Sequence, residues 1–442
     1  IYLVLFLCYE KQSRFQRVLP VLFLVCLSSE AFFNTKALIE GIGKEWGYPE
    51  YGLYTGSYNE IKSLVDQTKE ENADFYRLEN LDGVSRDDSF NYGYHGLTMF
   101  SSVRNRKSSS YMASLGYNST GTNLNITYQN NTILMDSLLG MKYNLSKEKI
   151  MKHGFEEVAK KGDYTLYENK NALPLGTLTD ENIYKEKFNS NQTALFKQLS
   201  GKNEELFKYT ELTEVKRQNM QIVESGDYTF MSAQTPGEKQ TITWKATVPA
   251  HSQAYLNLYA DTGLDVKGLK VTLSVNGVER TTEASMYGQY FNLGNYQEAQ
   301  EITFTASFSG QPVVKMIRPS ITLLKTDVFD QAVEEIRKQS VTFETNGRTA
   351  SADVQLETEQ VLFTTIPFDQ GWKAFAYGKE IKIKPVNDGL IALELPKGHH
   401  KITLRFLPQG FVIGASLFVG CIGSFIGYSV ILQQKKKRKE HA

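Results

Sequence analysis

The sequence predicts an α+β protein: an exofacial mixed α/β domain followed by β-sandwich-like domains, flanked by transmembrane helices. Three patterns in the 442 residues support this prediction. Residues 410–432 form an uncharged apolar run long enough to span a bilayer as a helix. Residues 40–235 mix helical and strand periodicities, which indicates an α/β domain. Residues 236–325 alternate polar and apolar side chains between turn signals, which is typical of a β-sandwich.

The orientation in the membrane follows from the charges beside the apolar runs. Residues 435–439 are all Lys or Arg, and they come directly after the last apolar run. Basic clusters mark the cytoplasmic flank of a membrane span. We therefore predict that residues 433–442 form a basic cytoplasmic tail and that the large domain before residue 410 is extracellular.

The other end of the chain predicts the same orientation. Residues 1–9 are apolar and lack an initiator Met and a charged leader, which indicates the end of a transmembrane helix rather than a signal peptide. Lys11, Arg14 and Arg17 then precede a second apolar run, and they place its start in the cytoplasm. We predict a transmembrane helix over residues 18–39 and a multi-pass membrane protein, of which this chain is a C-terminal portion.

Polar residues interrupt the second run near its outer end. Glu30 and Asn34 lie four residues apart and share one face of the predicted helix. Ionisable groups within spans usually face a polar interior, here an upstream transmembrane bundle of the same protein. Alternatively, Glu30 already lies at the membrane interface, and both interpretations remain open.

Within residues 40–235, local spacing predicts several elements. Helical spacing occurs over 58–69, 146–161 and 181–198, whereas 110–117 and 163–167 have the character of short strands. Gly162 and Asp163 end the second of these helices and lead into a strand.

Residues 236–325 and 326–407 are predicted to form two further units. Strands are expected over 241–247, 254–259, 270–275 and 301–308, with a hairpin turn at Asn276-Gly277. Residues 328–339 then form an amphipathic helix, and residues 354–407 return to strands as a small C-terminal β-domain. Hairpin turns are expected at 378–379, 387–389 and 396–398.

Composition limits the classes of function. Because the net charge is +0, no electrostatic surface for nucleic acid is expected. The three cysteines, Cys8, Cys26 and Cys421, all lie in apolar runs, so the extramembrane part must fold without disulfides. The 25 tyrosines suit either carbohydrate surfaces or ordinary β-sheets.

Motifs for phosphate cradles, zinc proteases and nucleophile elbows are missing from the sequence. No metal site is predicted at His399-His400, because adjacent residues of a strand point to opposite faces. Trp372 is either a platform for a sugar or an anchor of a β-domain core.

The densest group of chemically useful side chains lies in residues 86–96. Aromatic faces at this segment could stack on sugar rings, and Asn91 could bond hydroxyl groups. Asp87 and Asp88 could assist a divalent cation, which is the single cofactor the sequence suggests. The alternative is a glycine-rich turn that packs its aromatic side chains onto the domain core.

Several segments together resemble the C-terminal part of the YfhO family of bacterial membrane proteins. They are FYRLE at 75–79, NYGYHGLTMFSS at 91–102, DSLLGMKY at 136–143, YEN at 167–169, ALPLG at 172–176, IPFDQGW at 366–372, LPKGHH at 395–400 and PQGF at 408–411. The segments follow family order over nearly the whole chain, and the terminal span completes the set.

The resemblance implies a GT-C type glycosyltransferase. Such enzymes transfer a sugar from a polyprenyl-phosphate donor to a cell-envelope polymer such as lipoteichoic acid. Their general base is usually an acidic residue in the first exofacial loop, which would lie upstream of Ile1. The catalytic residue is therefore unknown within this chain, and the fragment is expected to be inactive alone.

Five residues are candidates for binding donor or acceptor. Arg77, Asn91, Tyr94 and His95 are expected to contact substrate near the membrane, and Glu30 is expected to face the upstream bundle. The alternative is a non-enzymatic, membrane-anchored module that binds glycans or assists envelope assembly. Membrane lipids are partners in either case.

Overall fold

The computed structural model describes residues 18–45, 51–102, 106–120, 125–258, 269–283 and 290–440. The chain divides into two units, residues 1–59 and 60–442, which are described separately. The expected transmembrane segment at residues 1–9 lies outside the described residues, as do the last two residues of the tail.

The first unit contains the helix α2 (Leu19–Glu45) and the short helix α3 (Tyr51–Thr55). Its 27 residues make α2 about 40 Å long, which exceeds the roughly 30 Å of a bilayer core. Most of its apolar side chains are exposed, so α2 is long and apolar enough to cross a membrane. The helix expected over residues 18–39 is therefore confirmed, and it continues to Glu45.

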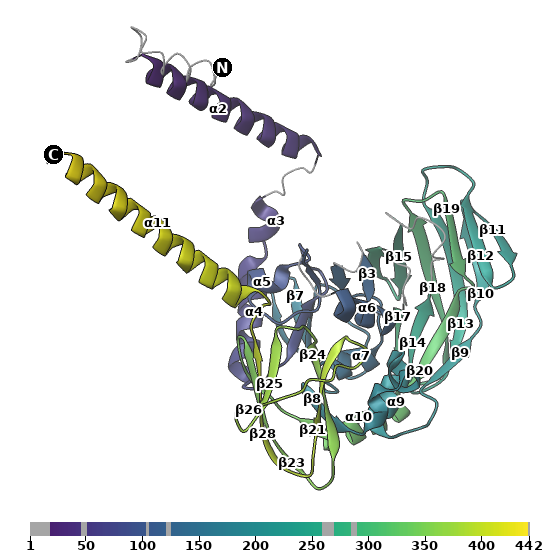
Figure 1. Ribbon diagram of the computed structural model, residues 1–442. Helices are drawn as coiled ribbons and strands as arrows, with labels where there is room; N and C mark the ends of the chain where they lie inside the picture. The colour runs from purple at the N-terminus through teal and green to yellow at the C-terminus, as the bar shows by residue number, and fades with distance from the viewer. Residues whose placement is uncertain are drawn as a thin grey trace. The chain divides into compact units, whose positions relative to one another are not determined.

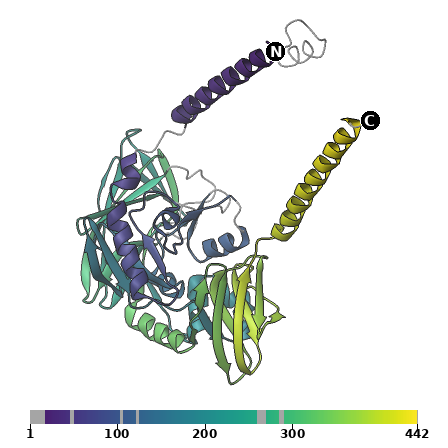
Figure 2. The ribbon, with the colours of Figure 1, turned by 90° about the vertical axis from the view of Figure 1, so that its left-hand side faces the viewer.

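The second unit ends in α11 (Phe411–Glu440), which has the same character. Figure 2 shows α11 continuing from the C-terminal strands. The apolar run 410–432 is thus confirmed as a helix, and the basic residues after it continue the helix instead of starting a separate tail segment.

The centre of the second unit is a mixed four-stranded sheet with the order β1-β5-β7-β6. β1 and β5 pair in parallel, and the other neighbours pair antiparallel. The strands are β1 (Arg77–Asn80), β5 (Met141–Ser146), β6 (Phe155–Lys161) and β7 (Tyr164–Asn169). Around them lie α4 (Tyr58–Glu71), α5 (Asp88–Tyr92), α6 (Arg106–Ser114), α7 (Ile133–Leu138), η1 (Glu181–Tyr184), α8 (Glu186–Asn189), α9 (Gln192–Ser200) and the small sheet β2 (Met99–Phe100), β4 (Asn125–Thr127), β3 (Asn118–Thr120).

The first sandwich packs two sheets, ordered β10-β13-β18-β15-β16 and β11-β12-β19, against a third ordered β17-β14-β20-β9. Its core includes Trp244 and Phe304, whose ring centroids lie 6.0 Å apart. The strands are β9 (Phe207–Thr210), β10 (Thr213–Gln218), β11 (Met220–Ser225), β12 (Tyr228–Ala233), β13 (Gln240–Val248), β14 (Ser252–Asn257), β15 (Lys270–Val275), β16 (Val278–Glu283), β17 (Tyr290–Tyr296), β18 (Gln300–Ser309), β19 (Val313–Ile317) and β20 (Ser320–Lys325).

The second sandwich packs the sheet β21-β8-β24-β27 against the sheet β22-β23-β28-β25-β26. Trp372 is half-buried against this core, and its ring centroid lies 5.2 Å from that of Phe406, so it anchors the β-domain. The strands are β8 (Gly176–Thr179), β21 (Ser340–Val341), β22 (Glu344–Asn346), β23 (Thr349–Leu356), β24 (Gln360–Pro367), β25 (Trp372–Ala376), β26 (Lys379–Ile381), β27 (Leu390–Leu395) and β28 (Gly398–Phe406).

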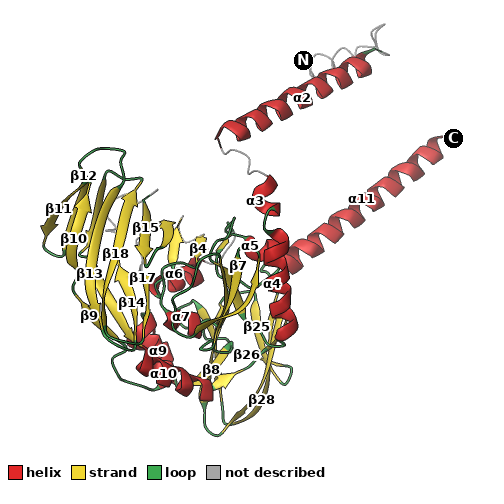
Figure 3. Ribbon diagram, turned by 180° about the vertical axis from the view of Figure 1, so that it is seen from behind, coloured by secondary structure: helices red, strands yellow, loops and turns green. Residues whose placement is uncertain are grey.

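A third core joins the sandwiches to the central sheet. Tyr255 on β14 and Phe363 on β24 are buried in it together with Phe196 of α9 and Phe329 of α10 (Thr326–Lys338). β14 and β24 are therefore covered on both faces, which explains why nearly all their residues are buried. Helices α6, α7, α9 and α10 lie between the two sandwiches (Figures 1 and 3).

Most local predictions are confirmed. α4, α10, β13, β14, β15, β18 and the strand at β7 occur where the spacing predicts them. Asn276 and Gly277 form the hairpin turn between β15 and β16, both with positive φ, as this turn type requires. The helix expected over 181–198 is split into η1, α8 and α9, because Asn191 caps a new helix by accepting from the N–H of Ala194.

Two of the elements predicted within residues 40–235 have the wrong type. Residues 110–117 are not a strand: they contain the second half of α6, whose apolar side chains are buried on several sides and so carry no clear period. Residues 146–161 are not a helix, because a loop precedes β6. The apolar residues with helical spacing do not share a buried face, because Phe155 is buried whereas Val158 is exposed at a β-bulge between Glu157 and Ala159.

The turns of the C-terminal β-domain differ from one another. Residues 377–378 connect β25 to β26 as a hairpin, and residues 387–389 close a turn at the Val386–Leu390 bridge. Residues 396–397 instead connect β27 to β28, which belong to opposite sheets, so the hairpin expected there is wrong. The sheets take strands from both sides of the predicted limits at residues 235 and 325, and those domain limits stay predictions.

Candidate functional site

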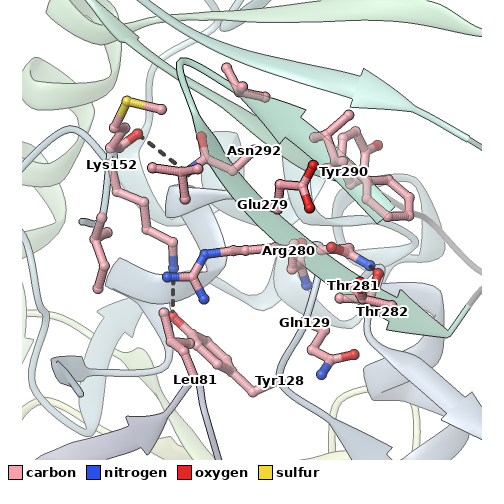
Figure 4. Close-up of a pocket in the computed structure, with 18 of the residues that line it drawn as sticks. Leu81, Tyr128, Gln129, Lys152, Glu279, Arg280, Thr281, Thr282, Tyr290 and Asn292 are labelled. Atoms are coloured by element: carbon pink, nitrogen blue, oxygen red, sulfur yellow. Dashed lines mark hydrogen bonds between the residues drawn. The ribbon is translucent and has the colours of Figure 1, made fainter. Parts of the chain in front are cut away.

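A cleft lies between the central domain and the β15–β16 hairpin of the first sandwich. It consists of two adjoining hollows with volumes of about 230 and 340 Å³. We call the first the Arg280 hollow and the second the Glu79 hollow. Both are lined by Leu81, Tyr128, Gln129, Thr281 and Thr282. The Arg280 hollow is shown in Figure 4.

A buried ion pair lies beneath the Arg280 hollow. Lys152 Nζ donates to Asp136 Oδ2 at 2.9 Å, to the Tyr128 hydroxyl at 2.8 Å and to Asn144 Oδ1 at 3.2 Å. The Tyr128 hydroxyl donates to the other Asp136 oxygen at 2.6 Å. Asp136 is only 1% exposed, because α7 is buried along its whole length. A buried carboxylate needs such a partner, and the pair gives this side of the hollow no net charge.

Arg280 supplies an open cationic group to this hollow. Its Nη2 donates to Ser146 Oγ at 2.6 Å, which connects β16 to the end of β5. Within the described ranges, this is the one hydrogen bond of the Arg280 side chain, and no carboxylate oxygen lies within 4.0 Å of the guanidinium group. The side chain extends across the hollow toward Lys152 and Tyr128 (Figure 4). Its remaining N–H groups are therefore available to an oxygen-rich ligand.

Amide, hydroxyl and aromatic groups complete this hollow. Tyr290, Phe291 and Thr281 line it, and Asn292 lies above them. Asn292 donates to the Met151 carbonyl oxygen at 3.2 Å, which fixes the loop before Lys152. The side-chain amide of Gln129 has no hydrogen bond to any residue that the structure describes. Flat aromatic faces beside the open amide of Gln129 suit a hydroxylated ring.

The Glu79 hollow is built around a buried carboxyl group. Glu79 is 3% exposed, and its Oε2 accepts from the N–H groups of Leu97 at 2.8 Å and Thr98 at 3.1 Å. Burial nevertheless raises the pKa of Glu79 to about 7, because the ionised form is poorly solvated. A carboxyl group with such a pKa in a cleft is a candidate for a functional role.

The next residue adds an unused donor. Asn80 is 7% exposed and also lines the Glu79 hollow. Its Oδ1 accepts from the N–H of Asp82 at 3.1 Å, whereas its Nδ2 has no partner among the described residues. Buried donors are rarely left unpaired, so this group indicates a place for a ligand or water.

A second carboxylate fixes the wall of the Glu79 hollow. Asp88 accepts from the N–H of Val84 and of Ser85, each at 2.9 Å. A Cβ at Gly83 would lie 2.9 Å from Asp88 Oδ2, so the loop needs glycine there. Asp87 Oδ1 accepts from the N–H of Phe100 at 3.0 Å. Both carboxylates thus hold loops, and the described part of the chain contains no group of three potential metal ligands.

Arg77, a predicted binding residue, lies in the interior. Its Nη2 donates to the Thr365 carbonyl oxygen at 2.9 Å, and its Nη1 donates to the Leu139 carbonyl oxygen. Burial lowers its pKa to about 10, so it remains a cation at neutral pH. In this structure Arg77 connects β1 to β24 of the second sandwich.

The other predicted binding residues are separated. Tyr94 is 8% exposed and lines the Glu79 hollow, whereas Asn91 is exposed on α5. The ring of His95 packs against Phe75, with centroids 4.9 Å apart. Glu30 lies on α2, in the other unit. Of these residues the structure brings only Tyr94 to the cleft, and their roles in binding stay predictions.

Glu79, Lys152 and Arg280 were not predicted as site residues. They come from three segments separated by more than seventy residues each, so no local motif joins them. Glu79 is part of the FYRLE segment, but β1 has the polar sequence RLEN, which does not predict that all four of its residues are buried.

A family model described as "Bacterial membrane protein YfhO" matches residues 1–418. A Bacillus subtilis (strain 168) relative, "Uncharacterized protein YfhO", is 22% identical over 437 residues, covering 92% of this chain and 49% of the relative. The chain therefore spans about half the length of that relative.

Two solved structures show weak similarity. The arabinofuranosyltransferase AftD from Mycobacteria, solved by cryo-EM, aligns with 37% of this chain and 12% of its own, at 16% identity and a TM-score of 0.14. Dimeric latent PorU from Porphyromonas gingivalis aligns with 57% of this chain and 27% of its own, at 13% identity and a TM-score of 0.15. Both scores are too low to establish a shared fold.

Proposed function

Because the chain belongs to the YfhO family of bacterial membrane proteins, we propose that it is the C-terminal, exofacial part of a polytopic membrane glycosyltransferase. In this proposal the full-length protein transfers a sugar from a polyprenyl-phosphate donor to a cell-envelope polymer such as lipoteichoic acid. Since the chain spans about half of its relative, transfer belongs to the full-length protein. The general base is expected in the part upstream of residue 1.

The cleft is the observation that supports this proposal. Glycans are recognised by planar amides, guanidinium groups and carboxyl groups that bond hydroxyls, together with aromatic faces that pack on the rings. The Arg280 hollow contains such a set in Arg280, Gln129, Asn292 and Tyr290. The internal Lys152–Asp136 pair cancels its own charge, so the charge that this hollow offers to a ligand comes from other lining groups, Arg280 among them.

The role of the cleft would be to hold the acceptor. Arg280 and Gln129 would donate hydrogen bonds to acceptor oxygens, and the rigid loops around Asp88 and Glu79 would keep the hollow in shape. Holding the acceptor chain near the membrane raises the concentration of its hydroxyl groups at the upstream active site. No proton transfer is assigned to a residue of this chain.

The large domain is proposed to be extracellular, with the end of α11 in the cytoplasm. The support is the run of Lys and Arg at residues 435–439 after the apolar part of α11, since basic residues remain cytoplasmic. This orientation places the cleft on the side where envelope polymers are modified.

A second candidate function uses the same cleft without catalysis. A membrane-anchored module that only binds glycans, or assists envelope assembly, needs the hydroxyl-binding set and the helices but no upstream active site. The two functions differ in whether sugar substituents on envelope polymers depend on the protein.

The test is deletion of the complete gene, followed by analysis of sugars on purified lipoteichoic acid and wall polymers. We expect one sugar substituent to disappear and the full-length gene to restore it. A variant with Arg280→Gln should restore less of it, and a variant with the exposed Lys216→Gln should restore all of it. Unchanged sugars on every polymer after deletion would refute the transferase and leave the binding module.

A further inference from the structure

We infer that the cleft binds two consecutive units of a chain, one in each hollow, so that the acceptor is recognised as an oligomer rather than as a single sugar. This inference rests on the proposed function, because it takes the ligand to be a glycan or polyol chain. It goes further in assigning the Glu79 hollow a separate binding role.

The first support is the continuity of the two hollows. Gln129 and the neighbouring Tyr128 line both of them from the central domain, and Thr281 and Thr282 line both from β16. A ligand that fills the Arg280 hollow therefore meets the Glu79 hollow at a shared wall. Apart from Leu81, the shared side chains carry a hydroxyl or an amide, which permits a polar linkage to pass between the hollows.

The second support is that each hollow has its own unused polar group. In the first hollow this group is the guanidinium of Arg280, whose one hydrogen bond to a described residue is the one to Ser146. In the second hollow, the Nδ2 of Asn80 has no partner in the described structure. Leaving a buried donor unpaired destabilises the empty hollow, so a ligand oxygen that accepts from this N–H group relieves that cost on binding.

The chemistry of the Glu79 hollow favours a hydroxyl group. A hydroxyl can donate to an ionised carboxylate and accept from a protonated carboxyl, so it fits Glu79 in both states. A neighbouring hydroxyl oxygen can accept from Asn80. The lining contains the carboxyl groups of Glu79 and Asp88 together with the basic side chains of Arg86 and Lys270, so this hollow is not a purely cationic phosphate site.

The same hairpin bounds both hollows, so their separation is fixed. Asn130 Nδ2 donates to Thr282 Oγ1 at 3.0 Å, and Arg280 donates to Ser146, which holds β16 against the central domain at two points. A rigid pair of subsites gains affinity from a second linked unit without a further loss of translational freedom.

The test measures affinity against chain length. The 442-residue chain in lipid nanodiscs would be titrated calorimetrically with two series of probes, each of one, two and three units: glycerol phosphate oligomers, and N-acetylglucosamine with its β-1,4-linked oligomers. In the series that binds, we expect Kd to fall at least tenfold from one unit to two and less than threefold from two to three.

Variants separate the two hollows. Lys270 is exposed at the rim of the Glu79 hollow, so Lys270→Trp should fill that hollow without disturbing the interior. This variant should abolish the fall in Kd from one unit to two and leave the Kd for one unit unchanged. Lys216→Trp, on an exposed strand of the same sheet, is the matched control and should preserve the gain.

Three other outcomes would overturn the two-unit inference. Equal affinity for one and two units would overturn the two-unit inference and leave the proposed function standing. A gain that persists in Lys270→Trp would place the second unit outside the Glu79 hollow and would also overturn it. If no member of either series binds, the proposed function fails and this inference fails with it.

Discussion

Replacing Glu79 by Gln should change how the stability of the protein depends on pH. Burial raises the pKa of Glu79 from 4.5 to about 7. An acid whose pKa is raised in the folded state binds its proton more tightly there than in the unfolded chain. Its favourable contribution is therefore complete below pH 4.5 and is lost as the pH rises from 4.5 to 7.

The magnitude follows from the size of the shift. A difference of roughly 2.5 pKa units corresponds to about 3 kcal/mol, at about 1.4 kcal/mol per unit. Gln resembles the protonated acid, since its carbonyl oxygen can still accept from the N–H groups of Leu97 and Thr98. We expect Glu79→Gln to match the parent protein near pH 4.5 and to be more stable by up to about 3 kcal/mol at pH 8.

The assay is denaturation of the detergent-solubilised chain at steps from pH 4.5 to 8.5, with the free energy of unfolding compared at each pH. Glu359→Gln, at an exposed turn between β23 and β24, is the control and should follow the parent protein. Equal pH profiles for parent and Glu79→Gln would refute the argument, because they would show that Glu79 ionises normally in the folded protein.

Three further predictions follow from the same contacts. Lys152→Met should destabilise the protein by about 3–5 kcal/mol in chemical denaturation, because it leaves the Asp136 carboxylate buried without its cation. Adding Asp136→Leu should recover most of the lost stability, and no recovery would contradict the ion-pair explanation. Gly389→Ala should lower the free energy of unfolding by about 1–3 kcal/mol in the same measurement, because the new Cβ would lie 2.4 Å from side-chain atoms of Tyr111. An unchanged stability would show that this packing is loose. A cysteine introduced as Glu359→Cys should react with a membrane-impermeant maleimide on intact cells, and labelling only after lysis would reverse the proposed orientation.

The elements of the fold were predictable where the controlling signal is local. β15 and its turn follow from alternating side chains and the Asn276-Gly277 pair, whose backbone requirement few other residues meet. α2 and α11 follow from long apolar runs. β6 was mistaken for part of a helix because its bulge is set by pairing with β7, which the local sequence does not show.

The site depends on contacts between distant segments, so the sequence showed little of it. Arg280 meets Ser146 only because a sandwich hairpin packs against the central sheet. For the 86–96 segment, the sequence left two interpretations open: contact with a substrate, or a turn packed on the domain core. Tyr92 and Tyr94 are buried, as the second interpretation expects, whereas Asn91 is exposed. The burial of Glu79 and its position in the cleft depend on tertiary contacts, which the sequence of its short strand does not show.

The central claim is that the cleft holds the acceptor for a sugar-transfer reaction of the full-length protein. The direct measurement is transfer of a labelled sugar from a polyprenyl-phosphate donor to lipoteichoic acid by the full-length protein in proteoliposomes, as a function of acceptor concentration. We predict that Arg280→Gln raises the KM for the acceptor at least tenfold with little change in kcat. An unchanged KM, or no transfer by full-length protein that binds the acceptor, would contradict the account.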